Sequence, residues 1–157
     1  MLVLREMRQG EFDDYCRYFT DDYSQEIVKN YGHGIEKAVE LANQDLIRCF
    51  PNGLESNEHS LLCIDVKDGD DVKLAGYLWH SVSSDGQSTF IYDFYIFEEF
   101  RGRGFGTKAM SALESQMRDI SVQQVKLRVA YHNERALKLY KEVGFSITGF
   151  NMSKTLE

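Results

Sequence analysis

The chain has 157 residues, which is enough to bury a sizeable hydrophobic core in one domain. Its 43% hydrophobic and 27% charged residues are ordinary for a soluble globular protein, and no apolar stretch reaches the about 20 residues of a membrane span. A formal net charge of −7 argues against general nucleic-acid binding and weakly favours a cationic partner. The N-terminal residues lack the basic region and cleavage site of a signal peptide, so we expect a cytoplasmic protein.

The N-terminal third of the sequence predicts one strand followed by two helices. Residues 2–7 alternate in polarity as a strand does, whereas apolar residues recur every three or four positions in 12–19 and again in 35–47. Glycines within 32–34 separate the two helices, and the turn 51–53 ends the second one.

The middle of the chain predicts a meander of three strands. The apolar and β-branched runs 60–67, 72–82 and 89–97 each have the length and composition of a strand. The polar, glycine-containing segments 68–71 and 84–87 are typical of hairpin turns. We therefore expect consecutive antiparallel pairing.

The last part of the chain alternates helix and strand. It predicts a helix over 104–120, a strand over 122–130, a helix over 133–143 and a final strand segment within 145–156. Together with the earlier elements this indicates an α+β or layered α/β fold.

The three cysteines, Cys16, Cys49 and Cys63, are widely spaced and contain no C-x-x-C pair. This spacing indicates neither a disulfide framework nor a zinc site, and reduced core thiols are typical of a cytoplasmic protein. We therefore expect no metal cofactor.

A glycine-rich turn, Arg101-Gly102-Arg103-Gly104-Phe105-Gly106, lies between a predicted strand and a predicted helix. Glycines let the backbone bend tightly against an anion, and the first N–H groups of a helix are unpaired, so the turn predicts a diphosphate site. A dinucleotide fingerprint is excluded because Thr107 stands where its third glycine belongs. A nucleoside-triphosphate P-loop is excluded because Thr107 and Lys108 are in the wrong order.

Two motifs stand out in the second half of the chain. The first is R-x-x-G-x-G, from Arg101 through Gly104 to Gly106, and the second is N-x-x-A-x-x-L-Y-x-x-x-G-F, from Asn133 to Phe145. Both resemble motifs of the GNAT superfamily of N-acetyltransferases, in particular its bacterial members. The resemblance covers residues 60–156 well and the earlier residues only in layout. It implies a single domain over 1–157, with a mixed central sheet of about six or seven strands flanked by about four helices.

The resemblance also implies acetyl-CoA as co-substrate. Backbone N–H groups from Arg101 to Thr107 are expected to hold its diphosphate, and the N–H of Ile96 to polarise the acetyl carbonyl. The residues implied in binding are Ile96, Phe97, Arg101, Gly102, Arg103, Gly104, Phe105, Gly106, Thr107, Asn133, Ala136 and Tyr140.

Tyr140 matches the position of the superfamily's general acid. A phenol with a pKa of about 10 can protonate the leaving thiolate. Asn133 and Tyr140 are two helical turns apart, so they share one helix face, and Asn133 also suits a helix N-cap. The alternative for Tyr140 is an aromatic side chain that only packs beside Leu137 and Val143.

Asp93 is the candidate general base. Many members of the superfamily carry an acidic pair here, but this chain has Tyr92 in place of the glutamate. A charge within an apolar aromatic strand needs a partner or a purpose. Three roles stay open for Asp93: base, anchor for a substrate ammonium, and structural hydrogen-bond acceptor.

The acceptor is set by the N-terminal half, where segment 20–59 is expected to cover the acceptor site. Candidate contacts are Tyr23, Tyr31, His33, the turn 50–54, Trp79 and His80. We expect direct attack by the primary amine of a small molecule in a ternary complex. The alternatives are a protein or peptide acceptor, and an acyl-CoA-binding module without catalysis. The chain is expected to act as a monomer or homodimer, without a nucleic-acid or membrane partner.

Overall fold

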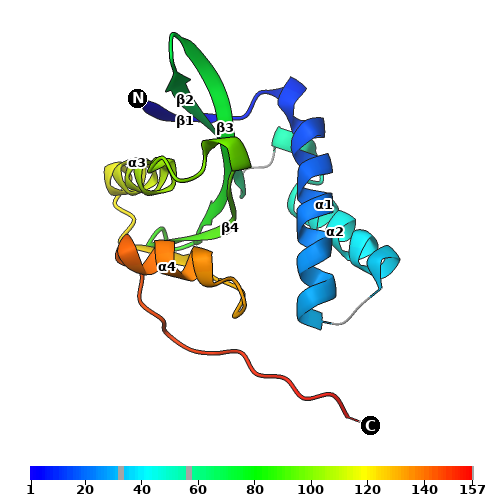
Figure 1. Cartoon of the computed structure of the whole chain (residues 1–157). Coiled ribbons are helices and arrows are strands. Elements are labelled where there is room, and N and C mark those ends of the chain that lie inside the picture. The colour runs from blue at the N-terminus through cyan, green and yellow to red at the C-terminus, as the bar shows by residue number, and fades with distance from the viewer. Residues whose placement is uncertain (32–33, 56–57, 157) are drawn as a thin grey trace.

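The computed structural model of the protein, which describes residues 1–31, 34–55 and 58–156, is built around one mixed sheet (Figure 1). The strands follow the chain in the order β1–β2–β3–β4–β5. The first three pairings are antiparallel and the last, between β4 and β5, is parallel. The strand bounds are β1 Leu2–Glu6, β2 Ser60–Asp68, β3 Asp71–Val82, β4 Ser88–Ile96 and β5 Gln124–Leu127.

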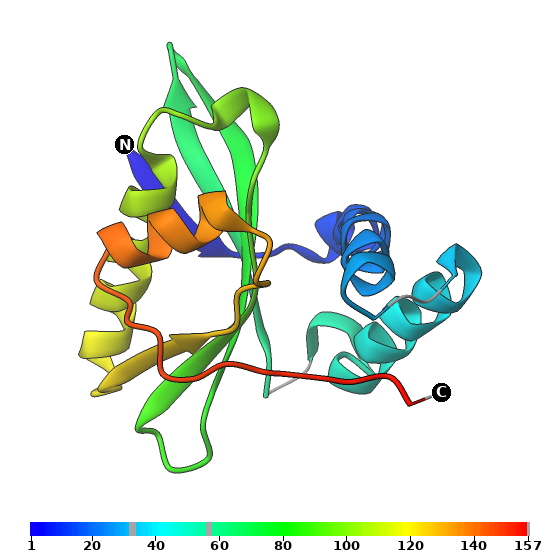
Figure 2. The ribbon, with the colours of Figure 1, turned by 60° about the horizontal axis from the view of Figure 1, so that its bottom comes forward.

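Within the described residues, four α-helices cover the two faces of this sheet, two on each side (Figures 1 and 2). Helices α1 (Phe12–Tyr31) and α2 (Ile35–Cys49) lie on one face, and α3 (Phe105–Asp119) and α4 (Glu134–Glu142) lie on the other. The layered fold and the four helices predicted from the sequence are thus confirmed. The predicted break between the first two helices includes residues 32 and 33, which lie outside the described residues.

Alternating side chains of β3 serve two separate cores. Trp79 packs toward α1 with Tyr15 and Phe19, whereas Leu78 packs toward α3 with Leu113. Because successive side chains of a strand point to opposite faces, an uninterrupted apolar run such as β3 can bury both sides.

A β-bulge divides β4 into two parts with different neighbours. The register with β3 shifts so that Trp79 pairs with Asp93 while His80 pairs with Ile91, which leaves Tyr92 as the extra residue. Pairing of β4 with β5 ends at Ile91. Beyond the bulge β4 diverges from β5, and the candidate active site lies in the gap between these two strands.

Gly76 on β3 permits the close approach of the divergent end of β4. A Cβ at this position would lie 2.0 Å from the backbone oxygen of Tyr95. Any larger residue would therefore push away the segment that carries Ile96. The sequence analysis did not single out Gly76.

The sheet has five strands in the described residues, fewer than the six or seven expected. The predicted final strand within 145–156 is not formed in the single chain, because residues 146–156 run out extended and exposed without pairing. The strand predicted over 122–130 is shortened to β5, since residues 128–130 face the gap rather than a neighbouring strand.

Candidate active site

A cleft of about 560 Å³ opens where β4 and β5 diverge. Five parts of the chain line it: α1, the end of β4, the glycine turn with the start of α3, the segment after β5, and α4. Its lining residues include Asp22, Glu26, Asp93, Ile96, Arg101, Gly102, Gly104, Phe105, Gly106, Thr107, Asn133, Ala136 and Tyr140. The motifs separated in the sequence therefore meet in one cavity.

The glycine turn presents the N-terminus of α3 to the cleft. Gly104 is the N-cap residue and adopts the left-handed conformation, with φ of 80° and no side-chain capping bond among the described residues. The first N–H groups of α3 are thus available to a ligand, and the helix dipole makes this end favourable for an anion. Gly102 is also left-handed, with φ of 74°. The turn therefore has the chemistry that a diphosphate group requires.

The two arginines of the turn lie in different places. Arg101 lines the cleft, and its Nε donates to the backbone oxygen of Ile96 at 2.8 Å. Arg103 is not among the lining residues, and its guanidinium pairs with Asp68 at 3.1 Å. Arg101 is therefore the arginine of the turn that contributes positive charge directly to the cleft.

Ile96 directs its backbone polar groups toward the open side of β4. The neighbouring N–H of Phe97 donates to Ala75 on β3 at 2.8 Å. Since successive N–H groups of a strand point to opposite edges, the N–H of Ile96 faces the gap. The ring of Phe97 packs against Tyr77 instead, with centroids 5.4 Å apart, and does not line the cleft.

Helix α4 brings three of the predicted residues to the cleft: Asn133, Ala136 and Tyr140. Asn133 caps the helix, because its side-chain oxygen accepts from the N–H of Ala136 at 3.1 Å. Tyr140 is half-buried, and its ring contacts Phe145 with centroids 5.6 Å apart. Burial, with the negative charge of Asp93, raises the pKa of Tyr140 to about 12, so the phenol stays protonated at neutral pH.

Asp93 is held by two tyrosines of α1. The hydroxyl of Tyr15 donates to Oδ2 at 2.9 Å, and that of Tyr18 donates to the same oxygen at 3.0 Å. Burial raises the pKa of Asp93 to about 7, although both hydrogen bonds act in the opposite direction. The carboxyl group is therefore divided between its charged and neutral forms near neutral pH.

Two further carboxylates of α1, Asp22 and Glu26, face the same cleft. They are one helical turn apart and half-buried, and burial raises the pKa of each. The charge of Arg101 opposes this shift at Asp22, and those of His132 and Arg128 oppose it at Glu26. The α1 side of the cleft thus gathers three carboxyl groups, those of Asp22, Glu26 and Asp93, with Arg101 and Arg128 nearby.

The sequence analysis missed the four polar residues of α1. Tyr15, Tyr18, Asp22 and Glu26 recur at intervals of three and four, so they form one stripe of the helix. That spacing was a usable signal, but only the packing of α1 on β4 shows that the stripe faces Asp93.

Several residues proposed for the acceptor pocket belong to the core instead. Trp79 is buried and its Nε1 donates to Nδ1 of His59 at 3.0 Å. His80 is buried beside Thr89, with 2.7 Å between Nδ1 and Oγ1, and burial lowers its pKa to about 4.

The other residues predicted to contact the acceptor either pack in the core or lie outside the described residues. Tyr23 packs on Phe19, with ring centroids 4.9 Å apart, and Phe50 of the turn 50–54 is buried. His33 and the side chain of Tyr31 lie outside the described residues.

Within residues 1–31, 34–55 and 58–156 no cluster of three or more His, Cys, Asp or Glu side chains could hold a metal ion. No helix in those ranges is long and apolar enough to cross a membrane. Cys16, Cys49 and Cys63 all lie in described segments and form no disulfide.

The fold and the cleft are those of an acetyltransferase, and comparison with known proteins gives the family. The model of the acetyltransferase (GNAT) family matches residues 12–145. The chain therefore belongs to the GNAT family, and it is an N-acetyltransferase.

Two relatives from Bacillus subtilis (strain 168) cover almost the whole chain. The uncharacterized N-acetyltransferase YycN is 34% identical over 157 residues, 99% of both proteins, and its crystal structure matches with a TM-score of 0.90 over 100% of this chain and 99% of that one. The uncharacterized N-acetyltransferase YdgE is 27% identical over 156 residues, 98% of both proteins.

A more distant structure shares the fold alone. It is AAC(6')-Iy in complex with the bisubstrate analog CoA-S-monomethyl-acetylneamine, which has a TM-score of 0.62 at 13% identity. The match covers 100% of this chain and 99% of that one.

Proposed function

We propose that the protein transfers the acetyl group of acetyl-CoA to the primary amine of a small, positively charged molecule. One observation carries this proposal: a single cleft has the uncapped N-terminus of α3 on one side and the carboxylates of Asp22, Glu26 and Asp93 on another. An anion-binding end and a cation-binding end in one cavity suit a reaction between an anionic donor and a cationic acceptor.

The donor end uses backbone groups of this chain. The first N–H groups of α3, with Arg101, bind the diphosphate, and the N–H of Ile96 donates to the carbonyl oxygen as negative charge develops on it. When bound, acetyl-CoA supplies an acetyl group activated as a thioester. The groups that move protons during the transfer are side chains of this chain.

Asp93 prepares the acceptor for attack. An amine attacks only as the neutral base, so the ionised carboxylate of Asp93 takes one proton from the substrate ammonium. A pKa of about 7 lets this carboxyl group both accept and release a proton near neutral pH. Tyr15 and Tyr18 keep its oxygens oriented through their hydrogen bonds.

Tyr140 completes the transfer. As the new C–N bond forms and the C–S bond breaks, the phenol of Tyr140 gives its proton to the departing sulfur. Because its pKa is raised to about 12, the hydroxyl carries a proton to donate throughout the neutral range. The nitrogen is positively charged once the C–N bond has formed, and it loses its second proton to solvent to become the neutral amide. The tyrosinate takes a proton back from solvent, and Asp93 releases the proton that it took from the ammonium.

Asp22 and Glu26 attract the acceptor. They are half-buried, face the cleft and lie one turn apart, so a second positive group of the substrate can pair with them while its reacting amine meets Asp93. Polyamines, cationic amino acids and amino sugars fit this description. An N-terminal peptide amine with neutral neighbours fits it less well.

The proposal is tested by release of free CoA thiol across a panel of amines with acetyl-CoA. We expect turnover with small di- and polycations, and about tenfold or greater loss of kcat/KM in the double variant Asp22→Asn/Glu26→Gln, because two charges that attract the cation are removed. The affinity for acetyl-CoA is expected to stay unchanged.

The matched control is Asp21→Asn, which makes the same chemical change on the exposed side of α1. It is expected to leave kcat/KM unaltered. Turnover of peptides and neutral amines, with no effect of the double variant, contradicts a small cationic acceptor and favours the peptide alternative.

A further inference from the structure

The last segment of the chain, residues 146–156, is extended and unpaired. Figures 1 and 2 show that it runs outward from the end of α4 and does not form another strand of the sheet. Every residue of the segment is exposed. Its sequence nevertheless has the composition of a strand, with Ile147, Thr148, Phe150 and Met152 close together.

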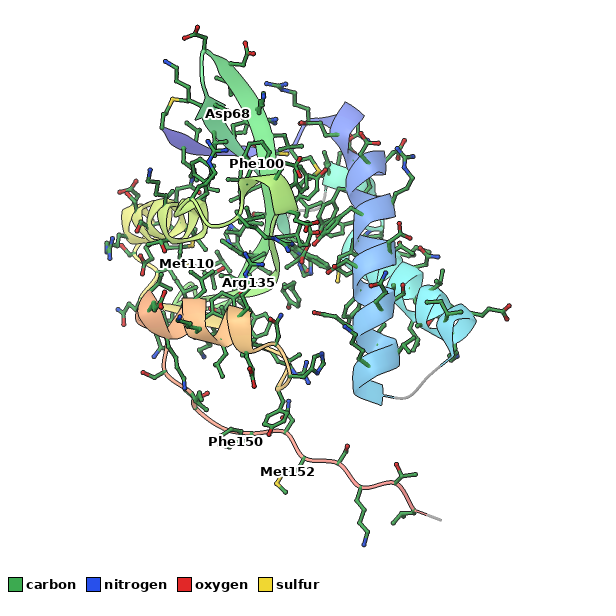
Figure 3. The ribbon with its side chains drawn as sticks, in the orientation of Figure 1. Asp68, Phe100, Met110, Arg135, Phe150 and Met152 are labelled. Atoms are coloured by element: carbon green, nitrogen blue, oxygen red, sulfur yellow. The ribbon has the colours of Figure 1, made fainter. Side chains whose placement is uncertain are left out.

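The segment exposes a run of large apolar side chains. Phe150 is 77% exposed and Met152 is 94% exposed, and both lie on the extended part of the chain in Figure 3. Phe150, Met152 and Leu156 have the same parity, so they lie on one side of an extended chain. Soluble monomers rarely present such a row to water, and a row of this kind marks a contact surface.

The sheet has an open edge beside the point where this segment begins. Strand β5 is the last in the order, and no described residue pairs with its outer edge. Outward N–H and C=O groups of an edge strand are a template for another strand. Phe145 and Val125 of β5 line the same cavity of about 230 Å³, so the segment leaves the molecule at this edge.

The start of the segment is fixed in direction. The N–H of Phe145 donates to the backbone oxygen of Tyr140 at 2.9 Å, and the two rings are in contact. Beyond this anchored residue the chain runs outward and does not pair with a strand of its own sheet. The outward course therefore favours a neighbouring molecule as the partner of the segment.

We propose that residues 146–156 of a second copy of this chain add as a strand to the outer edge of β5, and that the exchange is reciprocal. A twofold axis gives both copies the same contact and closes the assembly as a dimer. The cavity beside β5 has apolar lining residues in Met117, Val122 and Val125. It receives an apolar side chain of the exchanged strand, which removes both the exposed row and the open edge.

Sedimentation and hydrogen exchange of the full chain test this proposal together. We expect a dimer in which the amides of residues 147–153, and those amides of residues 124–127 that point away from β4, become protected together as the protein concentration rises. The variant Phe150→Lys/Met152→Lys is expected to be a monomer that keeps its fold, because these side chains are exposed in the single copy. The outward amides of its β5 are expected to exchange rapidly at every concentration.

The matched control is Ile47→Lys, which places the same charge on an apolar residue of α2 that is 69% exposed. It is expected to remain a dimer. A wild-type monomer overturns the proposal, even if both segments are protected within one chain. A dimer in which the outward amides of β5 and the amides of the terminal segment stay unprotected also overturns it.

Discussion

The two ends of the cleft are made of different kinds of chemical group. The donor end consists mainly of backbone groups from one short stretch, Ile96 to Thr107, and glycines at 102 and 104 set its shape. The acceptor end consists of side chains from distant elements, with Asp93 on β4 and Asp22 and Glu26 on α1. The first depends on local conformation and the second on tertiary packing.

This difference bears on which end of the cleft is shared across the family and which end sets the substrate of a particular protein. A site made of N–H groups accepts the same diphosphate whatever side chains surround it. A site made of charged side chains changes its substrate whenever one of them changes. The donor end accordingly carries the family's motif, whereas the acceptor end is where substrate preference is expected to reside.

The largest expected effect breaks the acceptor end. In Asp93→Asn the amide oxygen still accepts from Tyr15 and Tyr18, but no carboxylate remains to take the amine proton. We expect kcat to fall about 100-fold or more in the thiol-release assay. A rise in KM alone assigns Asp93 as an ammonium anchor, and unchanged kinetics reduce it to a structural acceptor.

The stability of the same variant provides an independent check. The folded pKa of Asp93 is about 7, above the ordinary value of about 3.9 for an aspartate. Ionisation of Asp93 therefore destabilises the folded protein. This destabilisation is absent at about pH 4, grows between the two pKa values and is complete above about pH 7. Asp93→Asn is expected to gain Tm over the wild type as the pH rises from about 5 to about 8. A constant difference contradicts the raised pKa.

A smaller effect is expected when the donor end is disturbed. Gly104 has φ of 80°, where a Cβ costs roughly 1–2 kcal/mol and the strain rotates the first N–H groups of α3. Gly104→Ala is expected to weaken acetyl-CoA binding about tenfold in calorimetry, with kcat at saturation nearly unchanged.

Gly34 provides the control for this change. It is the N-cap of α2 and has φ of −67°, which alanine adopts without strain. Gly34→Ala is expected to bind acetyl-CoA as the wild type does. Equal losses in both variants would mean that helix stability, and not the left-handed cradle, determines affinity.

The smallest expected effect sharpens the role of α1. Tyr18→Phe keeps the ring but removes a hydrogen bond that lowers the pKa of Asp93. In the proposed mechanism the ionised carboxylate takes the proton of the amine, so we expect the activity of the wild type to rise with pH through about 7. The variant is expected to shift this rise upward by about half a pH unit, or about threefold in rate on its acidic side.

The control is Tyr131→Phe, which removes the same hydroxyl group from an exposed tyrosine that lies away from the cleft. Its pH profile is expected to match the wild type. A profile that moves downward in Tyr18→Phe contradicts the proposed hydrogen-bond effect.

Most of the fold could be predicted because its signals are local. The apolar stripe of α2, with Ala38, Ala42 and Leu46 buried, follows from helical spacing alone. The final strand could not be predicted correctly, since residues 146–156 have the composition of a strand but no partner in their own chain. A strand forms only when its backbone pairs with a neighbouring strand, and the sequence of the segment does not specify that neighbour.

The sequence by itself determined the family and the residues that surround the donor end, because glycine spacing and an N-capping asparagine act through nearby backbone. Only the tertiary structure decided that Arg103 turns to Asp68 and that α1 supplies Tyr15, Tyr18, Asp22 and Glu26 to the acceptor end. Tyr15 and Tyr18 contact Asp93 although they are 78 and 75 residues away from it in the sequence. Such proximity is created by packing on a sheet, which no local pattern encodes.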